Sequence, residues 1–226
     1  MTIAERLAEV RERIAGAAAR AGRDPNEVIL VAVSKTFGTD AIIEGLEAGI
    51  HDFGENRAQE LRQKVAIVGD RVRWHFVGHL QTNKVRHVVG SAALVHSVDR
   101  FGLAEAIARR TRAAGTVQDV LIQVNVAGEG GKEGAGPEQA AALAEKVAAL
   151  DGIEVRGLMT MPPYPRDPED SRPHYARLRE LLDIVARDVP GTTELSMGMS
   201  RDLEIAVEEG ATLVRIGEAI FGSRTG

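Results

Sequence analysis

One lysine occupies a position where a charged side chain is costly unless it has a function. Lys35 lies near the end of residues 28–36, VILVAVSKT, an apolar run that predicts a strand buried on both faces. Because lysines are mostly exposed, one interpretation is a side chain whose ammonium reaches water at the rim of the fold. The other is an amine held partly out of water at the mouth of a barrel, where it can attack an aldehyde. This segment alone leaves both interpretations open.

Two loops near the C-terminus have the composition of a phosphate site. They read SMGMSRD and RIGEAIFG. Ser196 and Ser200 supply hydroxyl groups, while Gly198 and Gly217 allow backbone N–H groups to approach an anion close to a helix start. Serine and glycine are also ordinary cap and turn residues, so either loop alone supports both interpretations. The occurrence of both loops in one chain favours a phosphate.

A lysine that can form a Schiff base, combined with a phosphate site, is the pattern of pyridoxal phosphate (PLP). Arg215 lies in the last apolar segment and could point inward, at the pyridine nitrogen of such a cofactor. It could equally point outward to an ion pair at the rim, and the sequence leaves this choice open. The residues therefore predict PLP as the ligand, with the orientation of Arg215 undecided.

Strands and helices alternate along the whole chain. The alternation predicts parallel strands, and eight strand–helix units in 226 residues fit a single (β/α)8 TIM barrel. An open doubly wound sheet would have a glycine fingerprint after its first strand, where this chain reads SKTFGT. We expect one domain, 1–226, with an extra N-terminal helix at about 3–21. The predicted strands are 28–36, 50–53, 74–77, 94–99, 120–126, 155–161, 194–199 and 213–217, and the helix between the third and fourth is 82–89.

The active face of a barrel lies at the C-terminal ends of its strands. The polar residues predicted to gather there are Lys35, Asn56, His79, Ser97, Asn125, Thr160, Ser196, Ser200 and Arg215. Their convergence on one rim disfavours a pure interaction module. It favours instead a protein that binds a small molecule.

Composition excludes several other classes of protein. A net charge of −5 argues against a nucleic-acid binder, and a chain without cysteine has no disulfide and no thiolate metal site. The N-terminus is charged and amphipathic, unlike a signal peptide, and no apolar run approaches the roughly 20 residues of a membrane span. We expect a cytoplasmic monomer without a metal. His75 and His79 lie four apart, but in a strand and turn that lacks the zincin glutamate.

The glycine-rich segment 127–136 fits neither nucleotide-loop template. We interpret it as a flap over the barrel mouth. Lys132 within it is a weak candidate for a secondary cofactor contact.

Several motifs together resemble the YggS/PROSC family of pyridoxal-phosphate-binding proteins, nearly end to end. They are VAVSKTF, FGENRAQE, WHFVGHLQTNK, HSVD, GLMTM, LSMGMSRDLEIAVEEGAT and VRIGEAIFG. The resemblance implies the fold of the alanine racemase N-terminal domain and a Schiff base on Lys35. It places Arg215 near the ring nitrogen, and the phosphate and pocket residues that it implies are Ser196, Ser200, Gly198 and Gly217, with Asn56 and Met159 lining the pocket. Two positions depart from the family pattern, since Glu218 replaces a small hydroxyl residue and Gly38 replaces a proline.

The resemblance also implies a role in vitamin B6 homeostasis, and it leaves open whether PLP is passed to PLP-dependent apo-enzymes. The alternative is an amino-acid racemase or a related PLP-dependent enzyme on the same barrel. Racemisation needs a second acid–base group opposite Lys35, which in similar racemases is a tyrosine from an additional β-domain. We expect no such domain here, and Tyr164 is the sole plausible substitute. We therefore expect a PLP-binding protein without catalytic residues.

Overall fold

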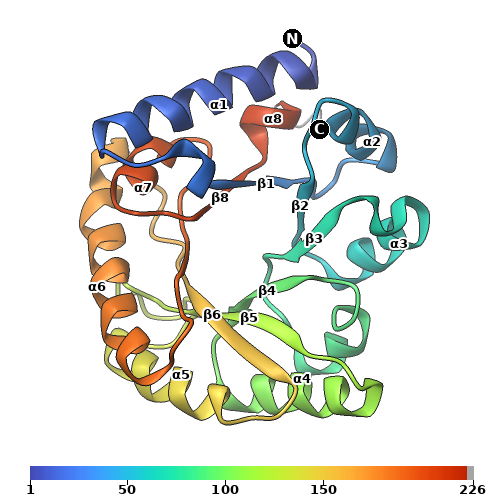
Figure 1. Ribbon diagram of the computed structural model, residues 1–226, viewed down its shortest axis with the longest axis vertical. Helices are drawn as coiled ribbons and strands as arrows, with labels where there is room; N and C mark the ends of the chain where they lie inside the picture. The colour runs from blue at the N-terminus through green and yellow to red at the C-terminus, as the bar shows by residue number, and fades with distance from the viewer. Residues whose placement is uncertain (223–226) are drawn as a thin grey trace.

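The strands of this chain run parallel and close into a barrel. A computed structural model describes residues 1–222, and residues 223–226 of the predicted domain lie outside the described part. Each strand pairs with the next along the chain, and the last pairs with the first (Figure 1). The strands are β1 (Ile29–Val33), β2 (Asp52–Glu55), β3 (Arg73–Phe76), β4 (Leu94–Val98), β5 (Gln118–Gln123), β6 (Ile153–Met159), β7 (Glu194–Ser196) and β8 (Leu213–Ile216). The predicted (β/α)8 barrel is confirmed.

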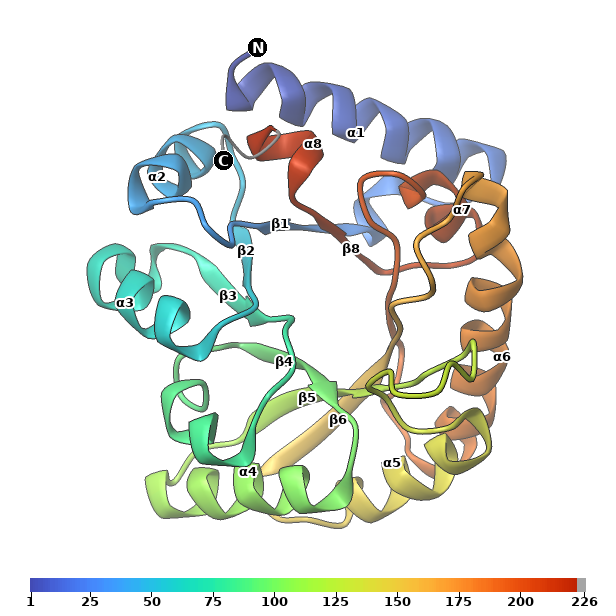
Figure 2. The same ribbon diagram turned by 180° about the vertical axis from the view of Figure 1, so that it is seen from behind.

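Helices surround the barrel on its outside, as both ribbon views show (Figures 1 and 2). The α-helices are α1 (Ile3–Arg20), α2 (Thr39–Glu47), α3 (Ala58–Val68), α4 (Phe101–Ala114), α5 (Ala140–Ala148), α6 (Arg172–Asp188), α7 (Leu203–Glu208) and α8 (Glu218–Phe221). The 3-10 helices are η1 (Pro25–Glu27), η2 (Gly69–Arg71), η3 (Thr82–His87), η4 (Pro137–Gln139) and η5 (Pro168–Ser171). The segment predicted as a helix at 82–89 is η3. It buries only Val85, so a full amphipathic α-helix has little to stabilise it.

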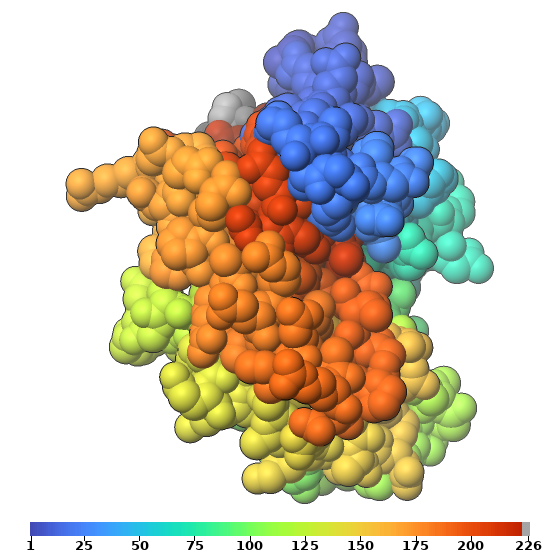
Figure 3. All heavy atoms as spheres, turned by 60° about the vertical axis from the view of Figure 1, so that its left-hand side comes forward, coloured from blue at the N-terminus to red at the C-terminus, as the bar shows by residue number. Residues whose placement is uncertain are grey.

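Helix α1 begins at a capping box, in which the Thr2 hydroxyl and the Glu5 carboxylate each bind the other's backbone N–H. Its apolar face packs against α7 and α8, beside the loops that follow β7 and β8. Figure 3 shows this side of the molecule, with α6 in orange next to the red segment that contains α7. The N-terminal helix thus supports the face that carries the predicted phosphate loops.

The interior of the barrel holds its own small apolar cluster. Its members come from five different strands: Val31, Leu94, Leu121, Met159 and Leu213. A larger core lies between the strands and the surrounding helices, which explains why the strands read as unbroken apolar runs. No helix within residues 1–222 is both long and apolar enough to cross a membrane.

Several strands end earlier than their apolar runs predict. The strand expected at 194–199 ends at Ser196, and the one expected at 120–126 ends at Gln123. Met197 and Val124 are nevertheless buried, at 0% and 1% exposure. An apolar run in the sequence indicates which residues are buried, and burial continues into loops that fold back over the core. A strand, in contrast, ends where its hydrogen bonds to the neighbouring strands end.

Candidate functional site

A cavity of about 1020 Å³ lies at the C-terminal ends of the strands. Five of the residues that the resemblance places at the cofactor line it: Lys35, Asn56, Ser200, Arg215 and Gly217. His79, from the predicted rim, also lines it, whereas Ser97, Asn125, Thr160 and Ser196 do not. Apolar surface comes from residues that include Val33, Phe37, Met161 and Met199. The cavity therefore combines an amine, a guanidinium and an amide with apolar walls, as small-molecule sites do.

Lys35 is half-buried and follows β1 in a tight turn. The Phe37 N–H donates to the Ser34 carbonyl at 3.0 Å, which closes the turn around Lys35. Thr36 adopts φ 70°, the only positive φ of a non-glycine residue within residues 1–222. This left-handed conformation disfavours a β-branched residue, so the surrounding structure must hold it. The turn fixes where the Lys35 side chain leaves the backbone.

A buried ion pair between Lys64 and Glu55 stabilises the same turn. Lys64 of α3 donates to the Glu55 carboxylate at 2.5 Å and to the Ser34 carbonyl at 2.8 Å. The Ser34 hydroxyl donates to the same Glu55 oxygen at 2.6 Å. Burial raises the pKa of Glu55, although Lys64 and Ser34 both oppose that shift. Because Ser34 directly precedes Lys35, these contacts position the base of the lysine side chain.

Asn56 sits where β2 ends, and its Oδ1 atom is buried without a hydrogen-bond partner in the described part of the chain. Gly78 permits this placement, since a Cβ atom at Gly78 would lie 2.1 Å from the Asn56 carbonyl oxygen. An orphaned buried acceptor on the wall of a cavity is costly unless a ligand or water donates to it. Asn56 is therefore suited to a polar ligand.

The two predicted phosphate loops meet at the cavity. The Ser200 hydroxyl accepts from the Ala219 N–H at 3.2 Å, which ties the loop after β7 to the loop after β8. Arg13 of α1 donates to the Ser200 carbonyl at 2.9 Å. Within residues 1–222, the backbone N–H groups of Ser200 and Gly217 donate to no other group. Both residues line the cavity, and backbone donors without an acceptor at such a place suit an anion.

Asp202 holds the first of these loops in shape. Its carboxylate accepts from the Met199 N–H at 2.8 Å, and from the Ser171 and Tyr175 hydroxyls at 2.7 Å each. Burial, followed by the Asp202 charge, raises the pKa of Tyr175, so this phenol remains protonated. These two hydroxyls anchor the loop to η5 and to α6.

Arg215 points into the barrel and lines the floor of the cavity, with 4% of its surface exposed. Its Nη1 donates to the Ser196 hydroxyl at 2.6 Å and its Nη2 to the Thr160 carbonyl at 2.8 Å. Burial lowers its pKa, but a guanidinium stays charged in proteins. Of the two orientations that the sequence leaves open for Arg215, the structure shows the inward one. No carboxylate forms an ion pair with Arg215 in the described chain.

Comparison with known proteins identifies the family. The model of the alanine racemase N-terminal domain matches residues 6–225. The curated pyridoxal phosphate homeostasis protein of Aquifex aeolicus is 47% identical over 226 residues, which covers 99% of each chain. This chain belongs to the pyridoxal phosphate homeostasis protein family. PipY of Synechococcus elongatus, solved with PLP bound, has a TM-score of 0.85 at 35% identity, covering 98% of this chain and 100% of PipY.

A more distant likeness concerns the fold alone. Alanine racemase of Corynebacterium glutamicum is 16% identical, with a TM-score of 0.71. The match covers 96% of this chain but only 61% of the racemase. The homeostasis family and the racemase thus share a barrel, and the racemase chain is the longer one.

Three residues predicted at the cofactor do not line the cavity. Ser196 is fully buried, and its hydroxyl contacts Arg215 and His96 inside the barrel, so it does not face the phosphate loops. Gly198, at φ 89°, packs against Ala206 so closely that a Cβ would lie 2.4 Å from the alanine Cβ, and it makes the turn after β7. Met159 belongs to the apolar cluster beneath the cavity. Met159 and Ser196 belong to strands and Gly198 to the first turn after β7, so all three are buried below the rim.

Other residues of the site were missed in the sequence. The sequence patterns single out neither Asp202 nor Tyr175 as part of the site. His96 was not singled out, and His75 was weighed only as a metal ligand; no cluster of three metal-binding side chains occurs in residues 1–222. The two histidines could have been found from their positions in the apolar strands β3 and β4, because a buried polar side chain there needs a hydrogen-bond partner inside the barrel.

The glycine-rich segment folds back along β5 near the cavity. The Asn125 N–H donates to the Ala135 carbonyl at 2.9 Å, and Glu133 Oε1 lies 3.1 Å from His79 Nδ1. Lys132 pairs with Glu129 within the segment. The segment thus lies beside the cavity wall, while its movement as a flap stays a prediction.

The acid stability of the fold should carry a signature of Asp52 on β2. Burial opposes ionisation of this carboxyl, but hydrogen bonds from His75 and Arg73 lower its pKa from 3.8 to about 2. A depressed pKa stabilises the fold fully above pH 3.8, and this contribution is lost as the pH falls toward 2. Denaturant unfolding of Asp52→Asn should therefore depend less on pH in this window than unfolding of the wild type. Equal slopes for the two proteins would contradict the assigned pKa.

Proposed function

We propose that this chain binds PLP in the cavity at the C-terminal ends of its strands, and that it serves PLP homeostasis. The observation that carries the proposal is the convergence of Lys35, Arg215 and the orphaned Asn56 oxygen on one cavity with unpartnered backbone N–H groups. These groups fit an aldehyde that carries a phosphate. The amine can react with the aldehyde, and the two loops can bind the phosphate. Arg215 adds a buried cation that has no ion-pair partner in residues 1–222. The homeostasis protein of Aquifex aeolicus and PLP-bound PipY support this reading.

Each residue has a separate task in this proposal. The Lys35 amine provides the covalent attachment point, and Arg215 donates toward the ring from the floor of the cavity. The phosphate is held by the Ser200 hydroxyl and by the N–H groups of Ser200 and Gly217, a smaller set than the sequence predicts. Glu218, which departs from the family pattern, is exposed at the rim. When bound, PLP supplies an electron sink for carbanion chemistry.

We propose further that residues 1–226 act as one cofactor-binding domain. A monomeric state, a cytoplasmic location and delivery of PLP to apo-enzymes stay predictions. Measuring transfer from the loaded protein to a PLP-dependent apo-enzyme, against free PLP at equal concentration, tests the last of them.

Ser200→Ala should weaken PLP binding and leave pyridoxal, which lacks the phosphate, almost unchanged. A hydrogen bond to a charged group is worth roughly 1.5–3 kcal/mol, so we expect a loss of at least about tenfold in PLP affinity. Titration of both ligands, followed by visible absorption, measures the two affinities. Ser91→Ala, on the opposite end of the barrel, is the matched control. Equal losses for both ligands would show that Ser200 supports the fold instead, and no binding of PLP by the wild type would refute the proposed function.

Efficient racemisation is not expected, because it requires acid–base groups on both faces of the substrate. Lys35 serves one face. Tyr164 is 74% exposed at the rim, with its hydroxyl 3.4 Å from an Arg201 nitrogen, and Tyr175 is held by Asp202. Solvent deuterium exchange at the α-carbon of alanine should stay well below about 1 s⁻¹, the lower end of ordinary enzymes. Exchange at or above that rate, abolished by Tyr164→Phe, would favour the racemase alternative.

A further inference from the structure

A continuous chain of hydrogen bonds crosses the barrel interior and ends at Arg215. Asp52 Oδ1 lies 2.8 Å from His75 Nε2, and His75 Nδ1 lies 2.9 Å from His96 Nε2. His96 Nδ1 lies 2.8 Å from the Ser196 hydroxyl, which accepts from Arg215 at 2.6 Å. The five residues belong to β2, β3, β4, β7 and β8, and none is more than 7% exposed. We call this set, Asp52, His75, His96, Ser196 and Arg215, the interior relay.

The two ends of the interior relay fix the direction of its terminal hydrogen bonds. A guanidinium can only donate, and an ionised carboxylate can only accept. Hydrogen bonds to Asp52 keep its pKa low, and burial lowers the pKa of His96 well below its usual value, so this ring is neutral. Arg215 therefore donates to Ser196, and His75 Nε2–H donates to Asp52. The two middle bonds are completed when Ser196 donates to His96 Nδ1 and His96 Nε2–H donates to His75 Nδ1. Every link then has one donor and one acceptor.

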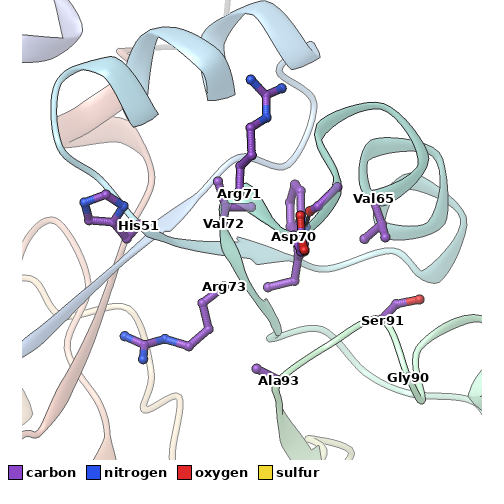
Figure 4. Close-up of a pocket in the computed structure, with 11 residues that line it drawn as sticks. His51, Val65, Asp70, Arg71, Val72, Arg73, Gly90, Ser91 and Ala93 are labelled. Carbon is purple, nitrogen blue, oxygen red and sulfur yellow. Dashed lines mark hydrogen bonds between the residues drawn. The ribbon is translucent and has the colours of Figure 1, made fainter.

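The far end of the interior relay reaches the opposite face of the barrel. Arg73 donates to both carboxylate oxygens of Asp52, at 2.5 and 2.8 Å, and its side chain is 56% exposed. It lines a second pocket, of about 600 Å³, at the N-terminal ends of the strands. Figure 4 shows Arg73 and Arg71 pointing in different directions there, so these cations do not converge on a ligand. The role of this end is to anchor Asp52.

We propose that Asp52, His75, His96 and Ser196 are positioning residues for PLP, because their one-way relay holds the Arg215 guanidinium in place on the floor of the cavity. The identity of the ligand rests on the proposed function, whereas the directions of the hydrogen bonds in the relay can be tested in the protein without ligand. An arginine side chain has many rotamers, and Arg215 lacks an ion-pair partner in residues 1–222 that would select one. The relay and the Thr160 carbonyl supply two fixed acceptors instead. Aligned hydrogen bonds in a low-dielectric interior also polarise one another, which strengthens each link.

The first test measures the histidine tautomers in the cofactor-free wild type. Long-range ¹H–¹⁵N spectra of labelled protein, assigned with His75→Asn and His96→Asn, should show a proton on Nε2 of each ring and none on Nδ1. A proton on Nδ1 of either ring at neutral pH would overturn the relay. This measurement requires no PLP binding, so it separates failure of the relay from failure of the proposed function.

The second test measures the affinity of the Ser196→Ala variant for PLP and for pyridoxal. The substitution should weaken contacts with the ring, which both ligands have, and leave contacts with the phosphate unchanged. We expect both affinities to fall by the same factor, about tenfold, because the arginine loses a fixed acceptor. His96→Asn should reproduce the effect, while His174→Asn, on α6, should not. Thermal unfolding confirms that each variant is folded under the conditions used. Unchanged affinities in folded Ser196→Ala, or a loss confined to PLP, would refute the positioning role, the latter by making Ser196 a phosphate ligand.

Discussion

Lys35→Ala is expected to abolish the covalent attachment of PLP while leaving a weaker, non-covalent complex. Lys35 is the lysine that lines the cavity, whereas the phosphate loops and Arg215 are contributed by β7 and β8 and are untouched by the substitution. The wild type should develop a visible absorption band on titration with PLP and retain the cofactor after borohydride reduction. The variant should retain none after denaturation and gel filtration, while equilibrium dialysis still detects bound PLP.

Two control variants separate the amine from its charge and from other lysines. Lys35→Arg keeps a cation at the same position but offers no nucleophilic amine. It should lose covalent retention as completely as Lys35→Ala. Lys132→Ala, in the glycine-rich segment, should behave as the wild type. Covalent retention by Lys35→Ala at the wild-type level would assign the attachment to a different lysine.

Lys64→Met should destabilise the fold strongly and disturb the Lys35 turn. The side chains of Lys64 and Glu55 are 9% and 0% exposed, and removal of Lys64 leaves a buried carboxylate without a charged partner. Such losses amount to roughly 3–5 kcal/mol in the free energy of unfolding. Denaturant unfolding measures this loss. Because Lys64 also binds the Ser34 carbonyl, we expect weaker PLP binding in the fraction that remains folded.

The pH dependence and a double variant test the cause of that loss. Burial raises the pKa of Glu55, so protonation can neutralise the isolated carboxyl. The variant should lose least stability at low pH and progressively more as the pH rises through the pKa of Glu55. Adding Glu55→Gln should restore a large part of the stability at neutral pH. A single variant within about 0.5 kcal/mol of the wild type would mean that the pair contributes little.

The sequence predicts the barrel well because its pattern is local. Eight apolar strands alternating with amphipathic helices indicate parallel pairing, and the lack of a glycine fingerprint after the first strand favours a closed barrel over an open doubly wound sheet. Strand C-terminal ends then share one rim by geometry alone. For this reason the sequence alone predicts that four residues lie close together, namely Lys35, Asn56, Ser200 and Arg215.

The depth of a side chain near a strand end could not be predicted in the same way. Ser196 and Ser200 look equivalent in SMGMSRD, but Ser196 is the last residue of β7 and faces the interior, while Ser200 lies beyond the turn. Met159 and Met161 differ in the same way, since only Met161 reaches the cavity. A shift of one or two residues in where a strand ends decides between the core and the rim.

The supporting contacts were hidden for another reason. His96 and Ser196 are 100 residues apart in the chain, and Lys64 reaches Ser34 across 30 residues. No periodicity connects such pairs, because they meet only once the barrel has closed. Buried polar residues in apolar strands are the one sequence signal that such partners exist.

The most direct test of PLP binding at the cavity is to locate the covalent attachment. The wild type is mixed with PLP, reduced with borohydride and digested, and the pyridoxyl-labelled peptide is identified by mass spectrometry. The chain has five lysines, Lys35, Lys64, Lys84, Lys132 and Lys146, so the result is discriminating. We predict stoichiometric label on Lys35 alone. Label on another lysine, or label spread among several, would contradict the assignment of this cavity as the PLP site.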